Sequence, residues 1–407
     1  MEDIVVGIDI GTSKVCAAIG RVDKNGKLTL LGVGVDSMNG VKKGIIVDID
    51  SVAKSIRSAV NQAEETSNLK IGSAYVNIMG THVSVIDNRF SMNVSADNRE
   101  ITSKDVDKIL SMARSVSIPE DRQIIDIIPR QYIIDGYDEI LEPVGMVGVK
   151  LEVDVDVVIG KITSVQNMVK SMERAGISVD GLVVEALSTG GFVLTPEEKE
   201  LSVLLIDVGA GITDVSVFKN KKMVFCDSIP VGGDHITNDI SIGLKISYSD
   251  AEKVKREYGL ALTSLIKNDQ EFTVTDNEGR KKNTKVSTVV EIIEARVYEI
   301  FSLVAEMIEK EGVPGISEVV ITGGGIMNSD GSADIAQEVF NTSVRVASCR
   351  LLGVSKYEHI TAAGMVKYIS GSRKGIIASD VRHIKPKSSK RESGFFKKLS
   401  KLFNNLF

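Results

Sequence analysis

The sequence predicts an α/β protein made of two similar halves, because the same series of elements occurs twice. Each half contains three strand-like segments rich in Val, Ile and Leu, separated by tight turns and followed by a helix-like stretch. The segments span 4–10, 15–22 and 28–35 in the first half and 201–208, 213–218 and 222–229 in the second. Each half also opens with an apolar strand that ends in Asp-x-Gly, IVVGIDIGTSK and VLLIDVGAGITD. We interpret this repeat as an internal duplication.

A segment between the two halves, residues 83–161, has a different character. A helix-like stretch at 103–116 stands among segments in which apolar and polar residues alternate, QIIDIIPRQYIID and VKLEVDVDVVIG. We predict a small α/β domain inserted here. Further helices are predicted at 50–67, 162–176, 185–193, 249–267 and 288–310, with a polar hairpin at 270–287.

The turn after each first strand predicts a phosphate site. A strand that ends in Asp and runs into Gly lets backbone N–H groups approach phosphate oxygens, because glycine has no Cβ in the way. Asp9 and Asp207 end the two strands and are expected to hold Mg²⁺ through water, since magnesium sheds its hydration shell reluctantly. One such turn is common in α/β proteins, but two at matched points of a duplicated fold favour phosphate binding. The expected phosphate ligands are Gly11, Thr12, Ser13, Lys14, Gly209, Ala210, Gly211 and Thr213.

A third glycine-rich turn, TGGGIM at 322–327, follows a short strand at 318–321. Such a turn allows a nucleotide to lie against a helix N-terminus, although it also serves as an ordinary strand-to-helix turn. The chain contains no G-x-x-x-x-G-K-[ST] motif, and no G-x-G-x-x-G opens a helix after a strand. P-loop and dinucleotide-binding folds are therefore excluded.

Composition narrows the class of protein. The chain has 407 residues, 43% of them hydrophobic, yet no apolar run reaches the roughly 18 residues that cross a bilayer, and MEDIVVGIDIG lacks a signal-peptide pattern. We expect the body to lie in the cytoplasm. Three widely spaced cysteines argue against disulfides or a Cys-rich zinc site, and four histidines lack metal-ligand spacing.

Charge is distributed unevenly along the chain. Residues 382–407 carry eight Lys or Arg against one acid, a local charge of +7, so the rest of the chain carries −13 of the total of −6. An acidic body argues against nucleic-acid binding, while a basic end points to an anionic surface such as the inner leaflet. Composition alone would favour the alternative, a solvated charged tail.

The last thirteen residues, FFKKLSKLFNNLF, have the pattern of an amphipathic helix. At about 100° per residue the apolar side chains fall within an arc of about 140°. The helix would be about 20 Å long, too short for a roughly 30 Å hydrocarbon core, so it is expected to lie flat on a membrane. A helix docked on the protein's own core is the alternative. The expected membrane-binding residues are Phe395, Phe396, Lys397, Lys398, Leu399, Lys401, Leu402, Phe403, Leu406 and Phe407.

Five segments together resemble the actin-like ATPase superfamily, in which two phosphate loops, two connecting segments and an adenosine loop surround ATP. These segments are, in chain order, IDIGTSKV, VEALSTG, IDVGAGITDVS, VVITGGGIM and ITAAGMVKY. Within the superfamily, GIDIGTSKV, IPRQYIIDG, GGDHITNDI and AEKVKREYG resemble the FtsA family of bacterial cell-division proteins. The basic linker and terminal amphipathic helix resemble that family too.

The resemblance implies an actin-like fold, two RNase H-like halves around a cleft that holds Mg-ATP. It places Glu185 where relatives orient the attacking water, although an acid that complements a helix dipole is an equal alternative. Glu252 and Lys255 fall where relatives contact adenosine, although an exposed i, i+3 ion pair would explain them as well. The other implied nucleotide-binding residues are Gly232, Gly233, Gly323, Gly324, Gly325 and Met327.

The resemblance also implies a division of the chain into subdomains. These are a first core subdomain (1–82 and 162–200), the insertion (83–161), a second core subdomain (201–230 and 315–381), an outer subdomain (231–314), a flexible basic linker (382–394) and the membrane-binding helix (395–407).

The function that the resemblance implies is that of a cytoskeletal adaptor in bacterial division. Such a protein binds ATP, turns it over slowly if at all, polymerises head to tail and ties FtsZ to the inner membrane at the division site, where later division proteins join. The FtsZ C-terminal tail would bind the outer subdomain. A pilus-assembly scaffold and a small-molecule kinase share the ATP core and remain alternatives, although neither explains the terminal helix.

Overall fold

The computed structural model of the chain describes residues 4–23, 27–95, 98–313, 315–326, 329–348, 354 and 356–372. The predicted linker, the predicted terminal helix, Met327 and Cys349 lie outside these residues. Among the described helices none is both long and apolar enough to span a membrane.

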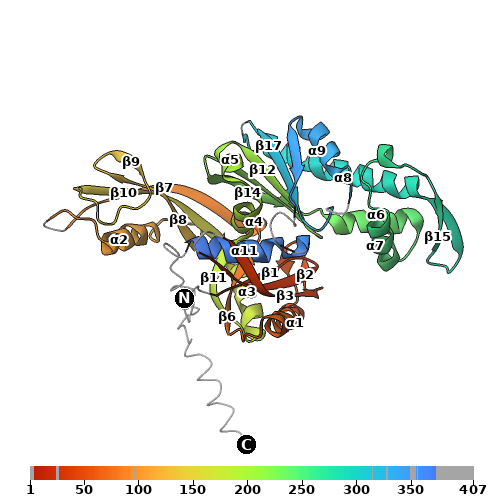
Figure 1. Cartoon of the computed structure of the whole chain (residues 1–407), viewed down its shortest axis with the longest axis horizontal. Coiled ribbons are helices and arrows are strands. Elements are labelled where there is room, and N and C mark those ends of the chain that lie inside the picture. The colour runs from red at the N-terminus through yellow and green to blue at the C-terminus, as the bar shows by residue number, and fades with distance from the viewer. Residues whose placement is uncertain are drawn as a thin grey trace, which may run out of the picture. The chain divides into compact units, whose positions relative to one another are not determined.

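Two five-stranded sheets with the same strand arrangement form the centre of the fold (Figure 1). The first has the order β3-β2-β1-β6-β11, with β1 Val5–Ile10, β2 Lys14–Val22, β3 Leu28–Ser37, β6 Ser73–Ile78 and β11 Ser178–Val184. The second has the order β14-β13-β12-β17-β18, with β12 Val203–Val208, β13 Thr213–Lys219, β14 Lys222–Ile229, β17 Glu318–Thr322 and β18 Ser343–Val346.

Strand directions match between the two sheets. In each, the first three strands in the chain pair antiparallel as a meander, and the last two run parallel to the first strand. Each sheet thus has three antiparallel strands connected by tight turns, followed by parallel strands reached through crossovers. Two sheets with this same arrangement in one chain are typical of an internal duplication. The predicted duplication is confirmed.

Helices cover both sheets and join them. The amphipathic α1 (Ile49–Ser67) packs on β2 and β3, and α3 (Ile162–Arg174) lies beside it. The helix α4 (Glu185–Val193) and the helix α11 (Ile360–Ser372) lie against each other, with α11 along β1 and β2 (Figure 1). Their backbones come so close that a Cβ on Gly364 would lie 2.6 Å from the Ser188 carbonyl oxygen. Phe192 and Val193 of α4 pack in one core with β12 and β13, so this helix pair links the halves.

The insertion in the first half is a separate small α/β unit, as predicted. Its antiparallel sheet has the order β7-β10-β8-β9, formed by β7 Val83–Asn93, β10 Lys150–Lys161, β8 Arg122–Ile134 and β9 Tyr137–Ile140. The helix α2 (Ser103–Ala113) covers it and shares a core with the apolar residues of β8 and β10. Because apolar and polar residues alternate along these strands, their side chains point to opposite faces of the sheet. The apolar side chains form this core on one face, and the Arg89–Asp154 ion pair lies on the polar face.

The outer part of the second half holds α6 (Gly233–Leu244), α7 (Tyr248–Glu257), the long α8 (Val286–Lys310) and the hairpin β15 (Glu271–Thr275) and β16 (Lys281–Lys285). The remaining elements are β4 Val41–Lys42, β5 Ile45–Ile46, α5 Pro196–Glu200, α9 Ser332–Phe340 and three short 3₁₀ turns at 80–82, 263–265 and 357–359.

The predicted helix at 249–267 is wrong over its second half. The helix α7 ends at Glu257, and the chain then forms a strand-like bridge, in which Ala261 N–H donates to the Asp330 carbonyl (2.8 Å) and Asp330 N–H to the Gly259 carbonyl (3.0 Å). Gly259 weakens the helix there, so a long-range partner decides the local structure.

Candidate functional site

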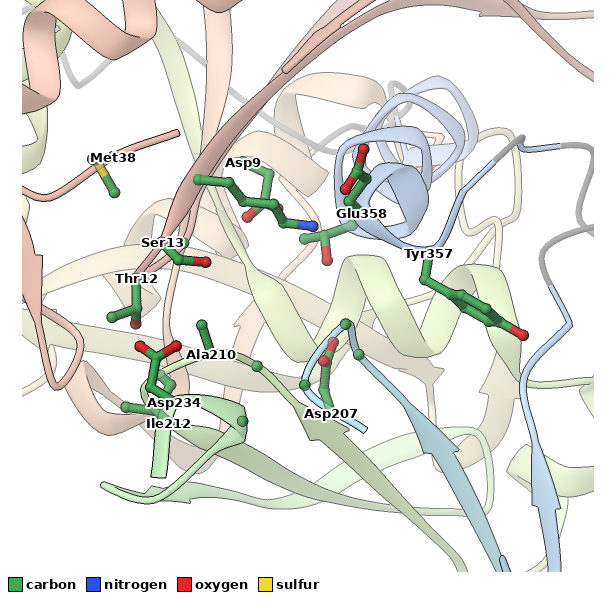
Figure 2. Close-up of a pocket in the computed structure, with 18 of the residues that line it drawn as sticks. Asp9, Thr12, Ser13, Met38, Asp207, Ala210, Ile212, Asp234, Tyr357 and Glu358 are labelled. Carbon is green, nitrogen blue, oxygen red and sulfur yellow. The ribbon is translucent and has the colours of Figure 1, made fainter. Parts of the chain in front are cut away.

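A cleft of about 930 Å³ lies where the two halves meet (Figure 2). Its walls include Asp9, Thr12 and Ser13 from the first loop and Asp207, Ala210 and Ile212 from the second. The glycines after β17, the start of α6 and residues 356–361 complete it. The two halves therefore contribute matched loops to one cavity.

The two Asp-x-Gly loops have the same backbone geometry. Gly11 N–H donates to the Lys14 carbonyl (3.0 Å), and Gly209 N–H donates to the Ile212 carbonyl (2.9 Å). Gly211 fits against the other loop, since a Cβ there would lie 2.5 Å from the Thr12 side chain. The loops are thus tight turns packed against each other across the cleft.

Asp9, Asp207, Asp214 and Glu185 form a cluster of buried or partly buried carboxyl groups that line this cleft. Burial raises the pKa of both Asp9 and Asp207 to about 6, with Lys14 as an opposing positive charge. Burial, reinforced by Asp207, raises the pKa of Asp214 to about 8. Burial and then Asp214, Asp9 and Asp207 raise the pKa of Glu185 well above its ordinary value. A cation bound among these carboxyl groups would favour their ionised forms and lower their pKa values.

Magnesium fits this set of donors. A hydrated Mg²⁺ bound through water and phosphate oxygen would offset the charge of Asp9 and Asp207. Among the residues that the structure describes, no three His, Cys, Asp or Glu side chains are grouped as direct metal ligands. Thr322 lies beside Asp207 in the sheet and lines the cleft, and its buried hydroxyl has no hydrogen-bond partner in the part of the chain that the structure describes. It is therefore a further group that a ligand or its water would satisfy.

Glycines pack backbone against backbone at the base of the second loop. Gly325 N–H donates to the Val208 carbonyl (2.8 Å), and Gly233 N–H to the Gly209 carbonyl (3.0 Å). Gly323 has φ +99°, a left-handed conformation that favours glycine, and a Cβ there would meet Val208 O at 2.3 Å. These glycines are required by the fold.

Gly324 differs from its neighbours. It lines the cleft, yet a Cβ added to it would meet no atom of the described residues within 4 Å. The absence of a side chain there leaves space in the cleft, not in the protein core.

We therefore expect Gly324→Val to weaken ATP binding at least about tenfold without lowering the melting temperature, because the new side chain intrudes on the cleft alone. Isothermal titration calorimetry with Mg-ATP measures the affinity. Gly72→Val is the matched control, since a Cβ on Gly72 also meets no atom within 4 Å and Gly72 lies outside the cleft. Unchanged affinity in Gly324→Val would mean that TGGGIM is only a structural turn.

The predicted adenosine contacts lie on the outer wall of the cleft. Glu252 accepts hydrogen bonds from Thr237 (2.6 Å) and Arg256 (2.8 Å) and pairs with Lys255 (2.7 Å). Burial disfavours its charge, but these bonds hold the pKa of Glu252 below its usual range. Lys255 is 12% exposed and also donates to the Gly233 carbonyl (3.1 Å), so the pair is more than an exposed surface ion pair.

Most of the predicted site residues line one cavity. These are Asp9, Gly11, Thr12, Ser13, Lys14, Glu185, Asp207, Gly209, Ala210, Gly233, Glu252, Lys255, Gly323, Gly324 and Gly325. Gly211, Thr213 and Gly232 are not among its lining residues. Gly211 packs on Thr12, the Thr213 hydroxyl donates to the Val231 carbonyl (2.8 Å), and a Cβ on Gly232 would meet the second loop's backbone at 2.7 Å. These three would act by shaping the loops.

Two polar residues of the carboxylate cluster were not predicted. Asp214 lies opposite Asp207 in the β12–β13 register, and its Oδ1 accepts a hydrogen bond from Gly80 N–H (3.2 Å). Asn77 lies next to the last residue of β6 and donates hydrogen bonds to both Asp9 and Glu185. The available signals were the second acid of IDVGAGITD and a lone amide in the apolar stretch AYVNIM.

Two family models match the chain. The model described as "Cell division protein FtsA" matches residues 204–364, and the model of the SHS2 domain inserted in FtsA matches residues 80–159. The second match falls on the four-stranded insertion.

Relatives and solved structures agree with these matches. The Bacillus subtilis cell division protein FtsA is 37% identical over 368 residues, which cover 90% of this chain and 83% of the relative. The type IV pilus biogenesis complex PilM–PilN is similar in structure (TM-score 0.59, 15% identity, 93% of this chain and 100% of that one). So is MreB5 of Spiroplasma citri bound to AMPPNP (TM-score 0.52, 16% identity, 91% of this chain and 97% of that one). The likeness to these two structures shows the fold, an actin-like one, and the identity to the Bacillus relative shows the family: this chain belongs to the FtsA family of cell-division proteins.

Proposed function

We propose that this protein is an ATP-binding, self-polymerising adaptor that tethers FtsZ filaments to the inner membrane during cell division. The observation that carries the proposal is the convergence of Asp9 and Asp207, from two matched loops, on one cleft in a chain of the FtsA family. An MreB neighbour of the same fold is described with a bound ATP analogue, AMPPNP, which supports ATP as the ligand.

Different residues of the cleft would bind different parts of Mg-ATP. The N–H groups and hydroxyls of Thr12, Ser13 and the second loop would bind phosphate oxygens, with Lys14 as the cation beside them. Asp9 and Asp207 would hold Mg²⁺ through water, and the metal would neutralise charge on the phosphates. Glu252 and Lys255 would contact the adenosine, while Gly324 leaves room for it. Glu185 would orient the water that attacks the ATP, and ATP hydrolysis would be slow.

Attachment to the membrane would depend on residues 395–407, which lie outside the described residues. Their sequence pattern, preceded by a basic stretch, supports a helix that lies flat on anionic lipid at the cytoplasmic face of the division site. One helix binds weakly, whereas a head-to-tail polymer presents many copies and binds far more tightly through effective concentration. Polymerisation and membrane binding would thus reinforce each other, and later division proteins would join the assembled polymer.

The outer subdomain, 231–314, is the proposed binding site for the FtsZ C-terminal tail. Its helices expose large apolar side chains, among them Ile242 on α6 (66% exposed) and Tyr298 on α8 (47%). The two helices are joined by the Arg296–Asp239 ion pair, at 2.6 Å from Nε to Oδ2. Exposed apolar groups on a rigid helical unit are typical of a peptide-binding surface.

We expect the double substitution Ile242→Asp and Tyr298→Asp to weaken binding of an FtsZ tail peptide at least about tenfold, because both apolar contacts are lost. Fluorescence anisotropy of a labelled peptide measures the affinity. Leu201→Asp is the control, since Leu201 is also exposed (55%) and lies outside the outer subdomain. If the double variant binds the peptide as tightly as the parent, the tail binds elsewhere.

The two alternatives are less well supported. The likeness to PilM–PilN is at 15% identity and concerns the fold, whereas 37% identity over most of the chain places the protein with FtsA. A small-molecule kinase would need an acceptor site for which no motif is visible, and an assay for phosphorylation of small acceptors separates it from an adaptor.

A further inference from the structure

Asn77 lies at the centre of the carboxylate cluster without belonging to either phosphate loop. It is 0% exposed, and it is the second-last residue of β6, the strand that pairs parallel with β1. A fully buried amide needs partners for each of its polar atoms, since an unmatched buried polar atom destabilises the folded state. The identity of these partners indicates what the residue does.

Each polar atom of the Asn77 amide has a functional partner. Nδ2 donates to Asp9 Oδ1 (2.9 Å) and to Glu185 Oε2 (2.9 Å), and Oδ1 accepts from Ile10 N–H (2.7 Å). The assignment of oxygen and nitrogen is fixed by these partners, because the flipped amide would direct its oxygen at two carboxylates. Asn77 therefore joins the end of β1, the proposed magnesium-binding Asp9 and the proposed water-orienting Glu185.

The two carboxylates come from distant parts of the chain, 68 and 108 residues from Asn77. Like charges so placed repel each other, and a neutral donor between them offsets part of that repulsion while fixing both side chains. At the matched position of the second half, Thr322 lies beside Asp207 but has an unpartnered hydroxyl. The bridge to a second carboxylate is thus a property of the first half, where Glu185 lies.

We propose that Asn77 is a positioning residue for ATP hydrolysis, which holds the Glu185 carboxylate in a fixed place relative to Asp9. The inference rests on the proposed function, because it takes Glu185 as the group that orients water. Both N–H donors of Asn77 are used, its oxygen accepts from Ile10 N–H, and Asn77 is not among the residues that line the cleft, so its influence passes through the two carboxylates.

The test is a double-mutant cycle on the full chain, read by single-turnover hydrolysis of radiolabelled ATP with Mg²⁺. Asn77→Leu keeps the approximate volume and removes the bridge, and we expect about tenfold or more slower hydrolysis with the Kd for Mg-ATP changed less than about threefold. In a Glu185→Gln background, adding Asn77→Leu is expected to change the hydrolysis rate less than about twofold, because the group it positions is already lost.

Controls separate positioning from folding and from the wider proposal. Gln131→Leu also removes an amide donor to a carboxylate, from Gln131 Nε2 to Asp154 Oδ2 (2.7 Å), but in the insertion, and is expected to hydrolyse ATP like the parent. Asn77→Ser, which leaves room for a water, replaces Asn77→Leu if the latter fails to fold, with the same expectations.

The positioning role is overturned if a folded Asn77 variant hydrolyses ATP as fast as the parent. It is also overturned if the rate losses from Asn77→Leu and Glu185→Gln multiply in the double variant. Either result leaves the proposal of ATP binding in place. A parent that does not bind ATP would overturn the proposed function itself. A parent that binds ATP without hydrolysing it would overturn the role of Glu185 and, with it, the positioning role of Asn77.

Discussion

Replacing Asp9 and Asp207 by Ala together is expected to abolish Mg-ATP binding while the chain stays folded. Both side chains line the cleft, each at the end of the first strand of its half, and both carry a pKa that burial raises to about 6. Because such a carboxylate is costly to ionise in the nucleotide-free protein, it contributes little to the free energy of folding. A bound cation stabilises its charged form, so the same carboxylate contributes strongly to binding. We therefore expect affinity to fall at least about a hundredfold, with the melting temperature of the nucleotide-free protein unchanged or higher.

Calorimetry with Mg-ATP and a thermal melt without nucleotide measure the two quantities separately. Asp126→Ala is the matched control, because burial also raises the pKa of Asp126 and this residue lies in the insertion, away from the cleft. Unchanged ATP affinity in the double variant would show that the paired loops do not form the metal site.

Replacing Phe396 and Phe403 by Glu is expected to release the protein from anionic vesicles while ATP binding persists. On a helical projection both residues fall on the apolar arc of the last thirteen residues. Half-burying seven large apolar side chains at about 1 kcal/mol each, with up to about 1 kcal/mol for each nearby lysine, gives a gross gain on the order of 10 kcal/mol, much of it offset by ordering the helix. Two buried carboxylates would remove the remaining net gain.

Sedimentation with vesicles that contain anionic lipid measures the bound fraction. Asn404→Glu with Asn405→Glu adds the same charge to the polar face and serves as the control, so that loss of apolar contact is separated from a change in net charge. Sedimentation of the Phe396 and Phe403 double variant with the vesicles would place the anchor elsewhere in the chain.

The parts of the fold that the sequence predicts well are those set by local pattern. The meanders, the two Asp-x-Gly turns and the long helix near 288–310 depend on alternation, glycine and helical periodicity, and the structure has all of them. The insertion was also predictable, because half-buried strands such as β10 alternate clearly between apolar and polar residues.

The parts that it misses depend on pairing between distant segments. Asn77 contacts Asp9 only because β6 pairs parallel with β1. The two residues are 68 positions apart, and the local sequence around either of them does not predict the register of that pairing. Thr213 and Asp214 are neighbours on a strand, so their side chains point to opposite faces. Thr213 was predicted to line the cleft, whereas Asp214 lines it. Likewise the helix α7 stops where a bridge to Asp330 replaces it.

The adaptor role is tested most directly by asking whether the protein brings FtsZ to a membrane. FtsZ filaments are mixed with anionic vesicles, Mg-ATP and the full chain, and the vesicles are then sedimented. The account predicts that FtsZ sediments with the vesicles when the intact chain is present and stays in solution when the chain lacks residues 395–407. If the intact chain sediments with the vesicles and FtsZ remains in solution, the account of this protein as a tether is contradicted.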